Sequence, residues 1–99
     1  MLTELELAHL RADLYSLGAT LYELLAARPP FTEQNQLRLL EAVIAKRPTP
    51  VVEINPGAPL GLSRLCERLL EKRPRDRPAD AGEVAAALRT TTARLAHPN

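Results

Sequence analysis

Residues 11–25 read RADLYSLGATLYELL, and they are the most informative part of the sequence for the fold. Its apolar residues recur at the spacing of an α-helix, and the prolines from Pro29 onward predict its end. Between Asp13 and Ala27 the only other charged side chain is Glu23, so the helix is apolar on nearly every side. Such a helix is typical of the centre of a larger protein. A closed four-helix mini-bundle, with a small part of this helix left uncovered, is the alternative.

Outward from this helix, proline residues divide the chain further. A second helix is expected at about residues 35–46, because Pro48 and Pro50 stop it. Residues 49–59 are expected to be an irregular connection. The apolar face of the second helix would consist of Leu37, Leu40, Val43 and Ile44.

Two more helices complete the expected fold. Pro59 suits the first turn of the third helix, which stops before Pro74. The fourth starts after Pro78, where Asp80 and Glu83 predict a capping box. The inner faces would be Leu62, Leu65, Cys66, Leu69 and Leu70 in the third helix, and Val84, Leu88 and Leu95 in the fourth. The predicted fold class is therefore all-α, with about four helices.

Composition narrows the possible functions. The chain has 99 residues, enough for one domain, and a net charge of +1, so neither nucleic acid nor a membrane surface is indicated as a partner. Cys66 is the only cysteine, which excludes an intrachain disulfide, and we expect it to be buried and unreactive. No apolar run reaches the roughly 18 residues of a membrane span, and residues 1–10 do not resemble a signal peptide. A cytoplasmic location is the expectation.

Three motifs, in order and at matching spacing, resemble bacterial serine/threonine protein kinases. Residues 11–25 resemble the central helix of the kinase helical lobe, with the family pattern S-D-(I/V/L)-(Y/W)-S-L-G-x-x-L-Y-E-L-L. Residues 27–31, ARPPF, stand where the family has G-x-x-P-F. Residues 69–78, LLEKRPRDRP, resemble L-L-x-K-(D/N)-P-x-x-R-P. The resemblance covers residues 11–89, a partial C-lobe, with residues 1–10 unmatched and 90–99 a C-terminal tail.

The resemblance implies structural roles for four residues of the central helix. Asp13 matches an aspartate that holds the catalytic loop, although a simple helix N-cap is the favoured interpretation here. Gly18 matches a glycine that admits a neighbouring backbone. Thr20 and Leu24 match the anchors of a hydrophobic column beneath the adenine ring, but ordinary core positions are the favoured interpretation.

Arg77 matches an arginine that pairs with the glutamate of the family's A-P-E motif, which is absent from the chain. We therefore expect Arg77 to be solvated or to pair with Asp76, Glu4 or Glu6. Lys72, Arg73, Arg75 and Arg77 together suggest either a basic docking patch or, as favoured, a solvated helix end.

The motifs of kinase catalysis do not occur in the chain: it contains no G-x-G-x-x-G, no H-R-D and no D-F-G. No catalytic, cofactor-binding or metal-binding residue is therefore predicted, and ATP and magnesium are expected in the complete family only. The predicted function is that of a non-catalytic part of a signalling kinase domain, whose partner is a protein or the remainder of that domain. The alternatives are an interaction module docking through Pro29, Pro30, Phe31, Leu37 and Arg38, and an unrelated helical DNA binder, which the few basic residues at 37–46 disfavour.

Overall fold

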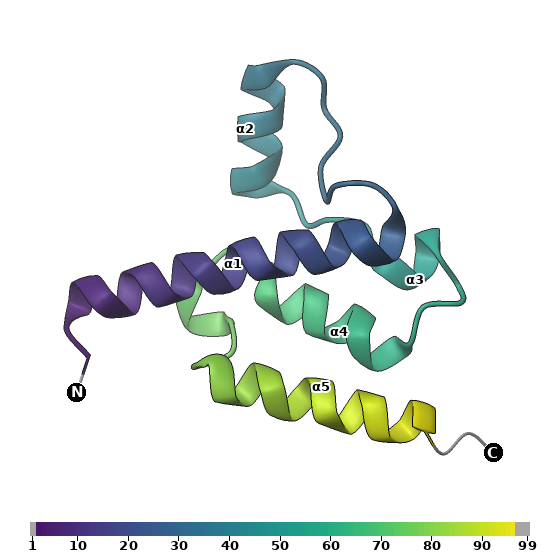
Figure 1. Ribbon diagram of the computed structural model, residues 1–99. Coiled ribbons are helices and arrows are strands. Elements are labelled where there is room, and N and C mark those ends of the chain that lie inside the picture. Colours follow the sequence, from purple (N-terminus) through teal and green to yellow (C-terminus); the bar gives the residue numbers. More distant parts are fainter. Residues whose placement is uncertain (1, 97–99) are drawn as a thin grey trace.

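The computed structural model describes residues 2–96, with side chains described through residue 91, and this part of the chain contains helices and no strand (Figure 1). The all-α fold class is therefore confirmed. The helices are α1 (Glu4–Ala26), α2 (Gln36–Ala45), α3 (Val51–Ile54), α4 (Leu60–Leu69) and α5 (Ala81–Ala96), with a 3₁₀ turn, η1, at Pro74–Asp76. None of the helices in the described part is long and apolar enough to span a membrane.

The long helix α1 runs across the molecule, with α4 packed along one side of it and α5 packed on α4 (Figure 1). Helix α2 stands on the other side of α1 and projects away from the rest (Figure 1). The core lies where α1 meets α3, α4 and α5. It consists of two clusters of buried residues, one of Tyr22, Ala26, Val51, Ala58, Cys66 and Leu70, the other of Leu14, Leu65, Leu69 and Val84.

Gly18 explains how closely α1 and α4 approach each other. A Cβ atom at Gly18 would lie 2.6 Å from the Cβ of Leu69 and 3.3 Å from its carbonyl carbon. The close approach implied by the resemblance is thus present, because only a glycine leaves room for α4 at this point of α1.

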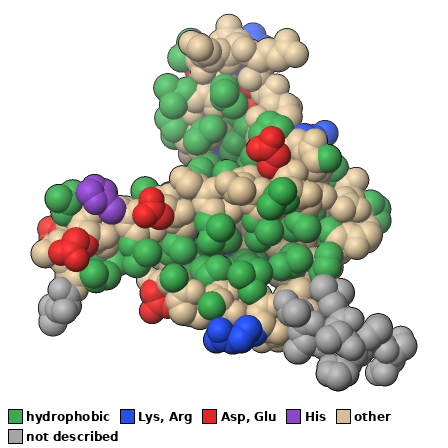
Figure 2. Space-filling model, in the orientation of Figure 1, with side chains coloured by type: hydrophobic (Ala, Val, Ile, Leu, Met, Phe, Trp, Pro, Cys, Tyr) green, Lys and Arg blue, Asp and Glu red, His purple; other side chains and the backbone are tan. Residues whose placement is uncertain are grey.

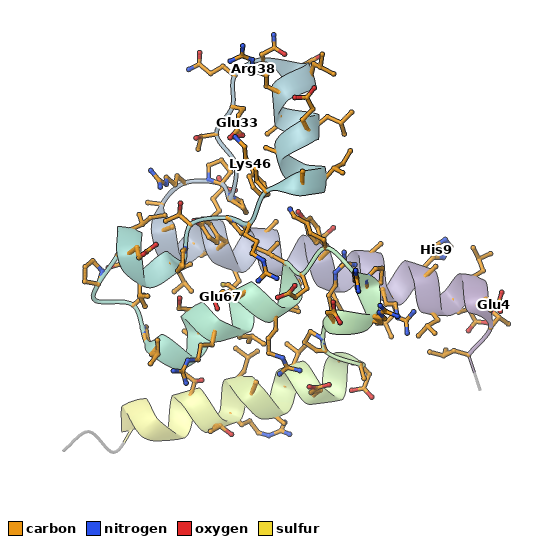
Figure 3. All side chains as sticks on the ribbon, turned by 180° about the vertical axis from the view of Figure 1, so that it is seen from behind. Glu4, His9, Glu33, Arg38, Lys46 and Glu67 are labelled. Atoms are coloured by element: carbon orange, nitrogen blue, oxygen red, sulfur yellow. The ribbon has the colours of Figure 1, made fainter. Side chains whose placement is uncertain are left out.

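The start of α1 corrects the interpretation of Asp13 as a helix N-cap. The helix begins at Glu4, and the Thr3 side chain accepts a hydrogen bond from the Glu6 amide, 3.1 Å away. Asp13 lies in the middle of the helix with an exposed side chain. Residues 4–10 thus extend α1 by two turns beyond the part that resembles kinases, and Figure 3 shows Glu4 and His9 on this extension.

The other helix boundaries follow the sequence signals, with two exceptions. Asn35 caps α2, and Pro59 precedes the first residue of α4. The segment 49–59, however, contains the short helix α3, so an entirely irregular connection was wrong. Helix α5 continues to Ala96, so residues 90–96 of the expected tail are helical, and its last three residues, 97–99, lie outside the described residues.

The predicted capping box at α5 is present in altered form. The Glu83 amide donates to Asp80 Oδ1 at 2.9 Å, while Glu83 Oε2 accepts from the Ala79 amide at 2.8 Å instead of from Asp80. On the inner face of α5, Val84 is buried and Leu88 lies at the edge with 37% of its surface exposed. The side chain of Leu95 lies outside the described residues.

Candidate functional site

Helix α1 has a second face that the rest of the described chain leaves open. Leu17 is 44% exposed and Leu24 is 77% exposed, and Thr20 between them is also exposed. The interpretation of Thr20 and Leu24 as core positions of this chain was therefore wrong. Figure 2 shows hydrophobic side chains gathered on the surface formed by α1 and α4. An exposed apolar surface on a central helix is typical of an interaction site.

Arg77 is half-buried beside α1 and is neither solvated nor paired with Glu4, Glu6 or Asp76, so that expectation was wrong. Its guanidinium donates to three backbone carbonyls: Nε to Glu71 at 2.9 Å, Nη1 to Arg11 at 2.9 Å and Nη2 to Lys72 at 3.4 Å. Its carbon Cζ lies 4.9 Å from the centre of the Tyr15 ring. Among the residues that the structure describes, no carboxylate forms an ion pair with Arg77.

A groove of about 520 Å³ lies between the N-terminal half of α1 and the C-terminal end of α2. It is lined by Ala12, Tyr15, Ser16, Val43, Ile44, Lys72 and Arg77. Burial lowers the pKa of both Lys72 and Arg77, and it raises the pKa of Tyr15, which the Arg77 charge opposes. The groove is therefore lined by apolar and aromatic side chains together with two basic ones.

The contact between Tyr15 and Arg77 was not predicted from the sequence. The scarcity of aromatic residues could have pointed to it, because Tyr15 is one of only three in the chain. An aromatic face is a common partner for a guanidinium that has no carboxylate. Which aromatic residue would meet Arg77 depended on the turn at residues 70–77, which sequence periodicity does not describe.

The basic cluster at residues 72–77 divides into two kinds of residue. Arg73 and Arg75 are exposed, in agreement with a solvated helix end. Lys72 and Arg77 instead turn inward and donate to backbone carbonyls. The four cations therefore do not form one continuous docking patch.

The predicted docking surface is only partly accessible. Leu37 is 65% exposed, and Arg38 and Pro29 are exposed as well. Pro30 and Phe31 are half-buried, and the Lys72 ammonium lies 4.6 Å from the centre of the Phe31 ring. Together with Leu40 and Ile44, which are 57% and 66% exposed, Leu37 forms an apolar stripe along α2.

Cys66 is buried at the contact between α1 and α4, as predicted. Burial and the neighbouring Glu67 raise the pKa of its thiol to about 11. A thiol with such a pKa is a poor nucleophile. Within residues 2–96, no group of three His, Cys, Asp or Glu side chains is placed to hold a metal ion.

Comparison with known proteins finds relatives among the protein kinases. No protein-family model matches the chain. It is 43% identical over 67 residues to Hybrid signal transduction histidine kinase G of Dictyostelium discoideum, a match that covers 68% of this chain and 2% of that protein. It is 33% identical over 85 residues to Probable serine/threonine-protein kinase PknB of Bifidobacterium longum, covering 86% of this chain and 12% of that protein. For Serine/threonine-protein kinase Pkn1 of Myxococcus xanthus, the identity is 35% over 83 residues, which cover 84% of this chain and 12% of that protein.

These similarities and the helical architecture identify the chain as a relative of serine/threonine protein kinases. It corresponds to the C-terminal part of the helical lobe of their kinase domain. The chain spans only a small fraction of the length of each of these relatives.

Proposed function

We propose that residues 11–89 act as a structural part of a serine/threonine kinase domain, with α1 as its central helix, and that this chain by itself does not bind ATP or transfer phosphate. The proposal depends mainly on one observation: the rest of the described chain packs against one face of α1 and leaves a second face exposed. One face is packed against α4, whereas Leu24 on the second face is 77% exposed. The remainder of a kinase lobe would bury this second face, and burial of a leucine side chain contributes about 1.5–3 kcal/mol.

The groove beside Arg77 supports the same proposal. Its guanidinium is half-buried, and the carbonyls that hold it carry no compensating charge. A carboxylate from the remainder of the lobe would supply that charge, and charge-assisted hydrogen bonds of this kind are about twice as strong as neutral ones. This is the pairing that the resemblance implies for Arg77. The proposed setting is cytoplasmic signalling, and the Dictyostelium relative is named as a signal transduction protein.

A chimeric kinase tests the proposal. Residues 11–89 would replace the matching segment in the Bifidobacterium longum relative, and autophosphorylation would be measured with labelled ATP. We expect the chimera to retain activity. Leu24→Asp in the chimera should abolish folding or activity, since a charge would then be buried without a partner. Leu37→Asp, on α2, is the matched control and should leave autophosphorylation unchanged.

Two results would contradict the proposal. Equal tolerance of Leu24→Asp and Leu37→Asp in an active chimera would show that the second face of α1 is not buried in the domain. Saturable binding of ATP and magnesium to the isolated 99-residue chain, below about 1 mM by calorimetry, would show that the chain has a nucleotide site of its own.

The second candidate is an interaction module, and the exposed stripe of Leu37, Leu40 and Ile44 on α2 favours it. The same chimera separates the two functions. If α2 docks protein substrates, Leu37→Asp should lower phosphorylation of a protein substrate several-fold while autophosphorylation is unchanged. If both activities are unchanged, the stripe has no role in docking that substrate.

A further inference from the structure

Helix α2 is the least anchored helix among those described. Neither cluster of core residues contains a residue of α2. Ala42 is its only fully buried residue, and three of its large apolar side chains are more than half exposed. A helix of 10 residues is marginal in water without tertiary packing. Segments with few buried apolar contacts open more readily than the rest of a protein.

One side chain contacts both this helix and the segment that precedes it. Lys72 follows α4, and its Nζ donates to the Val43 carbonyl in the last turns of α2 at 2.6 Å. The same ammonium lies 4.6 Å from the centre of the ring of Phe31, which precedes α2 in the chain. Lys72 therefore contacts the segment entering the helix and the helix itself, near the end closest to α1 (Figure 1).

The other polar attachments of this region lie beyond the helix. Tyr22 Oη donates to the Thr49 carbonyl at 2.5 Å, and Arg47 Nη1 lies 3.5 Å from Glu71 Oε1. The Arg47 side chain is 83% exposed, so this ion pair contributes little. Both contacts fix the connection after α2, and neither restrains the orientation of the helix. Among the described residues, the hydrogen bond that joins α2 itself to the body is the one from Lys72.

We propose that Lys72 is a latch: it holds α2 and the preceding segment from Phe31 against the body, and its release lets them swing as one unit. The consequence reaches the groove, because Val43 and Ile44 of α2 form one wall and Ala12 and Tyr15 of α1 the other. The latch thus sets the width of the groove and the direction in which the α2 stripe points. The inference depends only on contacts within this chain and is independent of the proposed kinase role.

Amide hydrogen exchange of the full chain tests the latch. In Lys72→Met, which keeps the apolar stem, the amides of Leu39 to Lys46 should exchange about tenfold faster than in the wild type. The amides of α1 and α4 should stay within about twofold. Arg73→Met is the matched control, because Arg73 is the neighbouring cation and is exposed. Phe31→Leu, which removes the ring but keeps an apolar side chain, should accelerate the same α2 amides by about threefold.

Each other outcome would overturn the latch. If α2 exchange in Lys72→Met stays within twofold of the wild type, the contacts of Lys72 do not hold the helix. If α1, α4 and α2 accelerate equally, or if the variant does not fold, Lys72 stabilises the whole fold and not α2 alone. If Arg73→Met has the same effect as Lys72→Met, the effect reflects net charge and not the contact with Val43.

Discussion

Two faces of helix α1 have similar compositions and different environments. Leu14, Tyr22 and Ala26 are buried against α3, α4 and α5, and Gly18 lets α4 approach them. On the second face, Leu17 and Leu24 are equally apolar and yet exposed. An apolar composition therefore identifies a helix that needs neighbours on several sides, and the position of Gly18 determines which face packs closely against α4.

The strongest test of this comparison replaces the same residue type on each face. Leu14→Ala should destabilise the chain by about 2–5 kcal/mol, because Leu14 is 4% exposed and its removal leaves a cavity. Leu24→Ala should change the free energy of unfolding by less than about 0.5 kcal/mol, because its side chain is already in water. Both values would come from one series of urea denaturations, followed by circular dichroism.

Similar losses of stability in the two variants would contradict this difference between the faces. The second face of α1 would then be covered in solution, for example by another copy of the chain. Sedimentation at two protein concentrations would show that association directly, because the stability of an associated chain depends on concentration.

The next effect concerns the cation beside α1. Arg77→Met should destabilise the chain by about 2–3 kcal/mol, because it removes charge-assisted hydrogen bonds to three carbonyls. Arg75→Met is the control and should cost less than about 0.5 kcal/mol, because Arg75 is exposed. If Arg77→Met lowers the free energy of unfolding no more than Arg75→Met does, Arg77 is solvated in solution, as was expected from the sequence.

Cys66 provides a pH test of the buried face. Its pKa is raised from 9.0 to about 11 by burial, so the unfolded chain loses the thiol proton first and stability falls as pH rises from about 9 to 11. At pH 10 this loss amounts to about 1.4 kcal/mol. We expect the stability difference between wild type and Cys66→Ala, measured under reducing conditions, to shrink by that amount between pH 8 and pH 10. A difference that does not change with pH would place water or a cation beside the thiol.

The smallest expected effect lies at the end of α1, where neither face is involved. Ala27 adopts a left-handed conformation with φ 60° and ψ 24° while its amide donates to the Glu23 carbonyl. Ala27→Gly should stabilise the chain by about 0.5–1 kcal/mol, because glycine adopts this conformation without strain. Ala12→Gly, at an exposed position within the same helix, should destabilise by about 0.5–1 kcal/mol. Thermal melting of both variants checks the opposite signs.

Prediction from the sequence succeeded where a local signal fixes the backbone. Asn35 starts α2 through a side chain that accepts from the Leu37 and Arg38 amides, and Pro59 marks the start of α4. Prediction failed at the start of α1, where a residue that often caps helices lies inside a helix that begins earlier in the chain. Asp13 is a good N-cap residue, but the helix continues to Thr3, which caps it instead.

Four features could be predicted from the sequence alone: the all-α class, most helix boundaries, the burial of Cys66 and the kinase resemblance. Each of these depends on periodicity, prolines or ordered motifs that are read along the chain. The tertiary structure was needed to show that Leu24 is exposed, that Arg77 donates to the carbonyls of Arg11 and Glu71, and that Lys72 donates to a carbonyl of α2. The physical reason is that these contacts join residues from different helices. Local propensity does not specify which carbonyl or ring will lie within 3 to 5 Å of a flexible cationic side chain.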